Sequence, residues 1–238
     1  MRTQKLSLLK KKLQKISSQE KAKASSWFFK TGEGQYGFGD KFIGATVPDQ
    51  REIAKEFKDL SLDDSEQLLQ SDIHEERLTA LFILVGKFKK ASEEERKNIF
   101  ELYLRNLKHV NNWDLVDSSA SQIVGEYVKN KKLTLLLVLA KSESLWEKRI
   151  SIISTFAFLK DKNAIPTYTI ADLLLSDRED LIQKAVGWAL RETGKYVSEV
   201  KLKEYLKKNY KKMGRTALRY AIEKFPPETR KKYLDGSV

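Results

Sequence analysis

Apolar residues recur along almost the whole chain at a spacing near 3.6 residues, the period of an α-helix. The clearest runs lie at Arg77–Phe88, Asp114–Val128, Glu147–Leu159, Leu181–Glu192 and Thr216–Phe225. Residues that end helices separate them: Asn111-Asn112, Asn130, Asp161, Ser176-Asp177, Gly194, Gly214 and Pro226-Pro227. Ser92, with Glu95 three residues later, predicts a capping box at a helix start. The pattern predicts an all-α fold.

The helical segments also repeat along the chain. Arg77, Arg149 and Lys184 occupy the same place in three similar segments. The midpoint of the interval from Arg77 to Arg149 falls on Trp113. A further 32 residues beyond Lys184 reach Thr216. A period in the thirties with two helices per unit is typical of α-solenoids of the HEAT or armadillo kind. We therefore predict one domain, residues 1–238, in which HEAT-like repeats form an α-solenoid with a concave binding face; a plain helical bundle is the alternative.

One irregular segment, Thr31 to Pro48 (TGEGQYGFGDKFIGATVP), interrupts the helical pattern. Four glycines recur in it at short spacing, and glycine-rich backbone can approach phosphates closely. However, no Gly-Lys-Ser/Thr sequence follows and no strand–helix context is evident, which argues against a nucleotide-binding loop. We expect an ordered loop that covers a helix end.

Charge is distributed unevenly. The chain has 45 Lys and Arg against 33 Asp and Glu, a formal net charge of +12. Residues 1–30 carry nine basic and one acidic side chain, and residues 191–238 carry fourteen and six. Each end therefore carries +8, which leaves −4 for residues 31–190. Basic ends suit a polyanion because each neutralised phosphate releases counterions; the alternative is that these lysines are merely solvated helix faces.

Composition excludes several classes of site. The sequence has no Cys and only His74 and His109, which rules out disulfides, a thiolate nucleophile and a Cys- or His-rich metal centre. The most apolar run, Leu133–Ala140, is too short to cross a membrane. The start, Met1–Ile16, lacks the apolar region and cleavage site of a signal peptide. We expect a cytoplasmic protein.

The repeat register brings chemistry-bearing residues into equivalent positions. Trp113 and Asp117 are four residues apart and share one helix face. Arg149, Lys184 and Trp188 lie on equivalent faces of the next two repeats. The spacing therefore predicts that two indole rings, a carboxylate and cations from three consecutive repeats converge on the inner surface.

Each of these residues also has a purely structural interpretation. Tryptophans on helices usually belong to the core. Asp117 could pair with Arg149, and Arg149 could simply tie neighbouring repeats together. Trp146 has no partner in the pattern and is interpreted as packing, and His109 as capping or packing. The combination favours function, because a carboxylate between two indole rings is an unusual choice on a surface that binds polyanions.

Several segments together resemble the AlkD family of bacterial DNA alkylation-repair glycosylases. They are Trp113-Asp114-Leu115-Val116-Asp117, Leu145-Trp146-Glu147-Lys148-Arg149, Ile182–Glu192 (IQKAVGWALRE), Gly37–Gly44 with Val47–Arg51, and Arg215–Ala221. The resemblance covers nearly the whole chain from about residue 20. The Trp-Asp-x-Val-Asp and Ile-Gln-Lys-Ala-x-Gly-Trp motifs are specific when found together.

The resemblance implies a HEAT-like helical solenoid that hydrolyses the N-glycosidic bond of N3- or N7-alkylated purines in duplex DNA, in base-excision repair and without base flipping. It implies that Asp117 is the catalytic carboxylate. Trp113 and Trp188 match the two tryptophans that pack against the backbone of the lesion, and Arg149 matches the cation on the phosphate side.

The same resemblance leaves one position open. Trp27 or Phe28 falls where the family has an N-terminal tyrosine, so a hydroxyl is missing there. For phosphate contacts we expect Lys148, Lys184, Arg191, Arg215 and Arg219. This hydrolysis needs no cofactor and no metal, and a monomer bound to double-stranded DNA is expected.

The chemistry of glycosidic-bond hydrolysis explains why a carboxylate and two indole rings would occur together. An alkylated purine already carries positive charge, so its glycosidic bond is primed to break through an oxocarbenium-like transition state. A carboxylate at Asp117 can stabilise that cation and position water, worth about 2.7–4 kcal/mol of barrier. Two indole rings add cation–π attraction of about 2 kcal/mol each when desolvated. A neutral base such as uracil would not be activated.

Two other functions are compatible with a basic solenoid. The first is a non-catalytic HEAT-repeat DNA-binding protein that recognises damaged, bent or branched DNA and releases no base. The second is a protein-interaction solenoid, against which the net charge and the Trp–Asp–Arg–Trp set argue.

Overall fold

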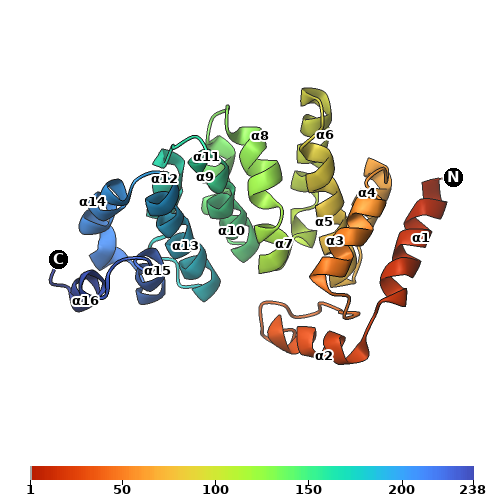
Figure 1. The fold of residues 1–238 in the computed structure, drawn as a ribbon, viewed down its shortest axis with the longest axis horizontal. Helices are drawn as coiled ribbons and strands as arrows, with labels where there is room; N and C mark the ends of the chain where they lie inside the picture. Colours follow the sequence, from red (N-terminus) through yellow and green to blue (C-terminus); the bar gives the residue numbers. More distant parts are fainter. Residues whose placement is uncertain (1) are drawn as a thin grey trace. The chain divides into compact units, whose positions relative to one another are not determined.

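The computed structural model describes residues 2–238, and the helical pattern is found almost throughout them (Figure 1). The helices are α1 Arg2–Lys15, α2 Gln19–Phe28, α3 Val47–Glu56, α4 Leu62–Leu69, α5 His74–Phe88, α6 Glu93–Arg105, η1 Leu107–His109, α7 Trp113–Asp117, η2 Ser121–Gly125, α8 Glu126–Val128, α9 Thr134–Ala140, α10 Leu145–Ser154, α11 Phe156–Leu159, α12 Ile165–Leu174, α13 Asp180–Tyr196, α14 Glu199–Asn209, η3 Tyr210–Lys212, α15 Arg215–Ala221 and α16 Pro227–Asp235. The only β pairing within residues 2–238 is an isolated bridge between Lys41 and Ile73. The all-α prediction is confirmed.

The chain divides into two compact units, Met1–Ile123 and Val124–Val238. The first is organised around α5, which packs on α3, α4, α6 and α7. Most of α5 is buried, including the charged residues of its first turn. Leu6, Leu9 and Leu13 bury one face of α1 in the same unit. Figure 1 shows α3, α4 and α5 side by side.

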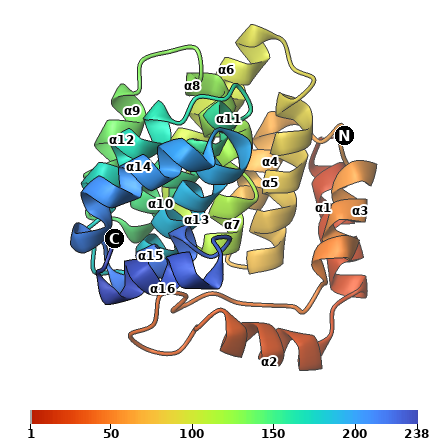
Figure 2. The same cartoon turned by 60° about the vertical axis from the view of Figure 1, so that its left-hand side comes forward.

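The second unit is built in the same manner around α13. This helix packs on α10, α12, α14 and α15, and α9 pairs with α10; these helices can be followed in Figure 2. Ile182, Val186 and Leu190 are fully buried on α13. Within each unit, successive helices pack as pairs in series, which is the organisation of an α-solenoid. One domain over residues 1–238 and the HEAT-like character of the repeats stay predictions.

The predicted helix Asp114–Val128 is wrong as a continuous element. The structure has α7, a turn, the π-helix η2 and then α8. The hydroxyl of Ser119 donates to the carbonyl of Leu115 (2.6 Å) and pairs with the Tyr103 hydroxyl (3.0 Å). Serine hydroxyls that bond to the backbone in this way compete with regular helix geometry.

Gly194 was predicted to end a helix, and this is also wrong, because α13 continues to Tyr196. A Cβ atom at position 194 would meet the Leu202 side chain of α14 at 2.7 Å. The glycine therefore serves the close approach of α14 rather than a helix stop.

Two other predicted helices are interrupted or shorter. Glu147–Leu159 is divided at Thr155, whose hydroxyl donates to the carbonyl of Ile152 (2.7 Å). Thr216–Phe225 ends earlier, because α15 stops at Ala221. The remaining predicted breaks lie between helices, except that Pro227 is the first residue of α16, and the capping box of Ser92 and Glu95 is confirmed.

The glycine-rich segment is an ordered loop that covers the first turn of α5, as predicted. The backbone N–H groups of Ile43 and Gly44 donate to the Glu75 carboxylate at 3.1 and 2.7 Å. The N–H of His74 donates to the carbonyl of Lys41 (2.8 Å). The loop thereby carries Asp40 and Phe42 to the start of α5. Within residues 2–238, every helix is too short or too polar to span a bilayer.

Candidate functional site

Trp113 and Asp117 begin and end α7, a helix of five residues. Asn112 caps it, since its side-chain oxygen accepts from the N–H of Trp113 (2.9 Å). Leu115 and Val116 are buried, whereas Trp113 and Asp117 remain partly exposed. The short amphipathic turn thus buries its apolar residues and leaves an indole and a carboxylate, one turn apart, accessible from outside the core.

Two aromatic rings at the end of α2 lie against Trp113, and one of them links it to rings from the loop and from α5. Phe29 stacks on it with ring centroids 5.1 Å apart, and Phe28 meets it edge-on at 5.8 Å. Phe29 also contacts Phe42 (5.1 Å) and His74 (5.0 Å). Trp27, in contrast, is 82% exposed. Of the two candidates for the N-terminal aromatic position, Phe28 therefore lies against Trp113, and Phe29 is a contact that the sequence did not indicate.

A buried charged network lies behind these rings. His74 is 1% exposed, and its Nδ1 and Nε2 lie 3.0 Å from Asp40 and 2.9 Å from Asp114. Asp40 also accepts from Arg77 (2.5 Å) and from the Asn112 side chain (3.1 Å). The loop, α5 and the first turn of α7 are therefore joined by one set of hydrogen bonds.

Hydrogen bonds and charges within the network shift the pKa values of two of its members. Burial alone would lower the pKa of His74, but its hydrogen bonds to Asp114 and Asp40 raise the pKa above the usual value. Burial would likewise raise the pKa of Asp40, but the bond from His74 and the charge of Arg77 hold it below its usual value. Both shifts favour the charged forms of the two groups.

Asp117 lies near the buried pair of Tyr103 and Ser119. Burial raises the pKa of the Tyr103 hydroxyl, the bond with Ser119 opposes this, and the charge of Asp117 raises it further. A fully buried, neutral Tyr103 thus underlies the end of α7 that carries Asp117. This end of the helix is fixed by packing as its beginning is fixed by the network.

In the second unit, Arg149 is 5% exposed on α10. Its Nη1 donates to the carbonyl of Leu181 in the first turn of α13 (2.6 Å). The interpretation of Arg149 as a tie between neighbouring helices is therefore confirmed. A phosphate contact by the same side chain stays a prediction.

Trp188 is half-buried on α13. Its Nε1–H donates to Glu192 (3.1 Å), and its ring meets Phe156 edge-on at 4.8 Å. Arg191 donates to the same oxygen of Glu192 and forms an ion pair with Glu223. The orientation of the indole is thereby set by contacts within its own unit.

The cations expected to contact phosphate fall into two groups. Lys148 pairs with Asp177 (2.9 Å) and Lys184 with Asp180 (2.7 Å), and Arg191 is paired as described. Arg215, exposed on α15, donates to the carbonyl of Leu234 (2.6 Å). Arg219 is exposed on the same helix and has no ion pair with another described side chain. Only the α15 pair therefore carries charge that no carboxylate neutralises.

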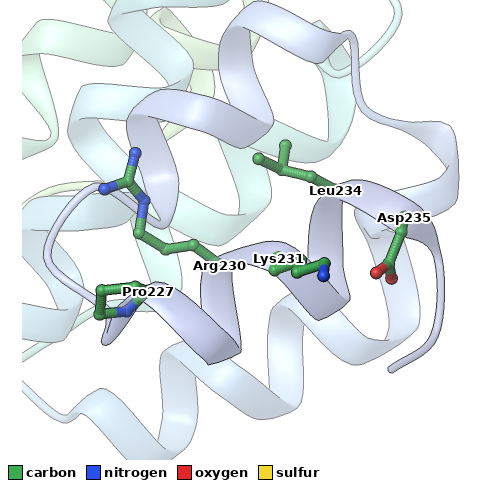
Figure 3. A pocket seen from close by; sticks show the side chains of 5 residues that line it. All are labelled: Pro227, Arg230, Lys231, Leu234 and Asp235. Carbon is green, nitrogen blue, oxygen red and sulfur yellow. The ribbon is translucent and has the colours of Figure 1, made fainter.

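Two hollows among the described residues have other linings. A shallow hollow of about 410 Å³ is lined by side chains of α16 alone: Pro227, Arg230, Lys231, Leu234 and Asp235 (Figure 3). A polar hollow of about 590 Å³ lies between α1 and the start of α5 and is lined by Lys10, Lys41, Gln67, Gln70, Ser71, Asp72, Ile73 and Glu76. Neither includes a predicted site residue. No group of three or more His, Cys, Asp or Glu in residues 2–238 is arranged to hold a metal.

The structure thus brings Trp113 and Asp117 together on α7, and it places Arg149 and Trp188 on the packed helices α10 and α13 of the second unit. The convergence of all four on one surface stays a prediction. Asp40, His74 and Asp114 were not predicted as a cluster. The three lie 34 and 40 residues apart, so no local spacing could reveal them.

Comparison with known proteins gives a consistent result. The family model described as DNA alkylation repair enzyme matches residues 9–225. Among solved structures, a predicted DNA alkylation repair enzyme from Enterococcus faecalis is similar, with 19% sequence identity and a TM-score of 0.65. The match covers 89% of this chain and 97% of that chain, and at this identity it shows the fold alone. Curated proteins gave no match.

Proposed function

This chain belongs to the DNA alkylation repair enzyme family, and we propose that it is a DNA glycosylase that removes N3- and N7-alkylated purines from duplex DNA. The observation that carries the proposal is the pair on α7: a partly exposed Asp117 one turn from a partly exposed Trp113. Both ends of that helix are anchored by buried polar groups. An anchored carboxylate beside an aromatic face suits a cationic transition state.

In this proposal Asp117 acts on the sugar. The alkylated purine leaves as a neutral base, and positive charge develops on C1′ and the ring oxygen as the glycosidic bond breaks. The Asp117 carboxylate stabilises that charge and orients the water that attacks C1′. Trp113 packs against the sugar–phosphate backbone of the lesion, and the base is not flipped into a pocket.

The second unit supplies the other contacts in the proposal. Trp188 provides a second indole and Arg149 a cation for the phosphate, while Lys148, Lys184, Arg191, Arg215 and Arg219 neutralise the backbone on either side. The protein acts as a monomer on double-stranded DNA and needs no cofactor. The basic ends of the chain, +8 each, supply the attraction to DNA.

Substitution of Asp117 by Asn tests the assigned role. Asn keeps the shape but not the charge, so single-turnover release of N7-methylguanine from a duplex should fall by roughly 10²–10³-fold. Binding to the same duplex should change little, since Asp117 contributes no attraction to phosphate. Equal release rates for Asp117→Asn and wild type would contradict the role.

A non-catalytic DNA-binding protein is the second candidate. It is favoured by one observation: Arg149 and Trp188 are both engaged in bonds within their own unit, which would hold them there without any chemistry. This function predicts salt-sensitive binding of damaged duplex with no base release by wild type. The release assay above separates the two candidates directly.

A further inference from the structure

His74 lies between two carboxylates. An ionised carboxylate can accept hydrogen bonds but cannot donate them. The Nδ1 of His74 lies 3.0 Å from Asp40 and its Nε2 lies 2.9 Å from Asp114. A neutral imidazole has one N–H, so one ring nitrogen would turn a lone pair toward a carboxylate oxygen. Both contacts are satisfied only when both nitrogens carry a proton. The geometry alone therefore favours a buried imidazolium.

The imidazolium reaches the proposed active helix by two routes. Asp114, its partner through Nε2, belongs to the first turn of α7 and also accepts from the N–H of Leu115 (2.9 Å). The second route runs through rings. His74 stacks on Phe42 at 4.5 Å and contacts Phe29 at 5.0 Å, and Phe29 stacks on Trp113. A cationic ring stacked on an aromatic face gains cation–π attraction that a neutral ring lacks.

We infer that His74 is a positioning residue whose imidazolium holds α7 and the Trp113 ring in the orientation that Asp117 needs. It touches neither DNA nor the reacting atoms in this scheme. The inference rests on the proposed function, because the orientation is useful only if Asp117 acts on the sugar. Loss of the proton would break one of the two carboxylate bonds and leave an uncompensated negative charge behind α7.

The charged groups that face His74 come from each element packed around it. Asp40 faces it from the loop, Asp114 from α7 and Arg77 from α5 itself. With the imidazolium present, two carboxylates are balanced by two cations. The two carboxylates raise the pKa of His74 against burial and the Arg77 charge, so the network favours the protonated ring.

The test measures the titration of His74 and the rate of base release in parallel as pH rises. The chain has only two histidines, so ¹³C-labelled histidine gives two ring signals, and His109→Gln assigns them. Asp114→Asn keeps the shape but removes one charge, which should lower the pKa of His74 by about 1–3 units. The alkaline limb of single-turnover base release should move down by the same amount. Both proteins receive the same lesion duplex, so titration of the lesion itself cancels.

His109→Gln also serves as the matched control, because it removes the other histidine from the short helix η1. It should leave the titration curve of His74 and the pH profile of base release unchanged. His74→Gln should release base at least ten-fold more slowly than wild type and lose the alkaline limb altogether. If this variant fails to fold, Asp114→Asn still decides. A His74 titration that moves in Asp114→Asn while the rate profile stays in place would overturn the inference.

A different readout separates failure of the inference from failure of the proposed function. If wild type releases no base at any pH, the glycosylase proposal fails. The ¹⁹F signal of fluorotryptophan at Trp113, assigned with Trp113→Phe, then replaces the rate. A Trp113 signal that shifts with the His74 titration supports the positioning role, and one that is indifferent to it overturns the role.

Discussion

Arg149 shows how one side chain can serve both the fold and the proposed chemistry. The repeat register identified it as a candidate cation, and the structure places it in a buried bond to the carbonyl of Leu181. The register indicated a possible tie between repeats but not this bond, because Leu181 lies 32 residues away on α13. A buried arginine that already orders the start of α13 is also rigid, which suits a precise phosphate contact.

Replacing Arg149 by Met should lower the free energy of unfolding by about 1–3 kcal/mol, since the buried carbonyl of Leu181 loses its donor. Urea denaturation of the two proteins measures this. Lys55→Met, which removes an exposed lysine paired with the exposed Glu52 on α3, is a suitable control and should cost less. Unchanged stability in Arg149→Met would mean that the bond to Leu181 is not a structural tie.

His74 and Asp40 make stability depend on pH in opposite directions. The pKa of His74 is raised on folding, so its contribution is fully present below about 6.5 and is lost as pH rises through the folded value. The pKa of Asp40 is lowered, so its contribution is present above about 3.9 and is lost as pH falls through the folded value. The stability gap between wild type and His74→Gln, measured by urea denaturation, should therefore shrink on the alkaline side. A gap that stays constant from pH 5 to pH 9 would show that the charge of His74 is irrelevant.

At the scale of helices, two glycines both lie within predicted helices, but the space around them differs in the structure. Gly86 lies in α5 with open space where a Cβ atom would be. Gly187 lies in α13, and its Cβ would collide with the carbonyl of Ala217 and with Tyr220 on α15. The glycine of the Ile-Gln-Lys-Ala-x-Gly-Trp motif is therefore explained by the close approach of α13 and α15.

This difference predicts opposite effects of the same substitution. Gly86→Ala should raise the free energy of unfolding by about 0.5–1 kcal/mol, because alanine favours the helix. Gly187→Ala should instead destabilise by about 1–3 kcal/mol through overpacking. Chemical denaturation of the two variants checks both signs. Stabilisation in both would mean that α15 does not pack closely on α13.

The elements themselves were largely predictable, and the exceptions have local causes. Helix starts, the capping box and the loop over α5 follow from short patterns in the sequence. The break after α7 depends on Ser119 pairing with Tyr103, and the role of Gly194 depends on Leu202 of α14. Both are contacts with a separate helix, which periodicity along one helix does not contain.

At the scale of the whole molecule, the repeat register is the strongest result of the sequence. Its positions Arg77, Trp113, Arg149, Lys184 and Thr216 all fall within the first five residues of a helix. The candidate pair on α7 follows from that register. The network of Asp40, His74 and Asp114 does not, because a loop outside the repeats supplies Asp40.

Net charge allows a prediction for DNA binding by the whole chain. Each cation that contacts phosphate contributes about 0.9 to the slope of log affinity against log salt. Arg219→Gln should lower that slope by about this amount, measured by fluorescence anisotropy over a salt series. Lys160→Gln, which removes a lysine already paired with Glu126, is the matched control and should leave the slope unchanged. An Arg219→Gln slope equal to that of wild type would remove α15 from the proposed interface.

The proposed activity of this chain is cleavage of the glycosidic bond of cationic purines. The most direct measurement is single-turnover base release by wild type from two matched duplexes, one with N7-methylguanine and one with uracil. We expect release of N7-methylguanine alone, because only the cationic base is primed to leave. Tight binding of both duplexes with release of neither base would contradict it and identify a DNA-binding protein without glycosylase activity.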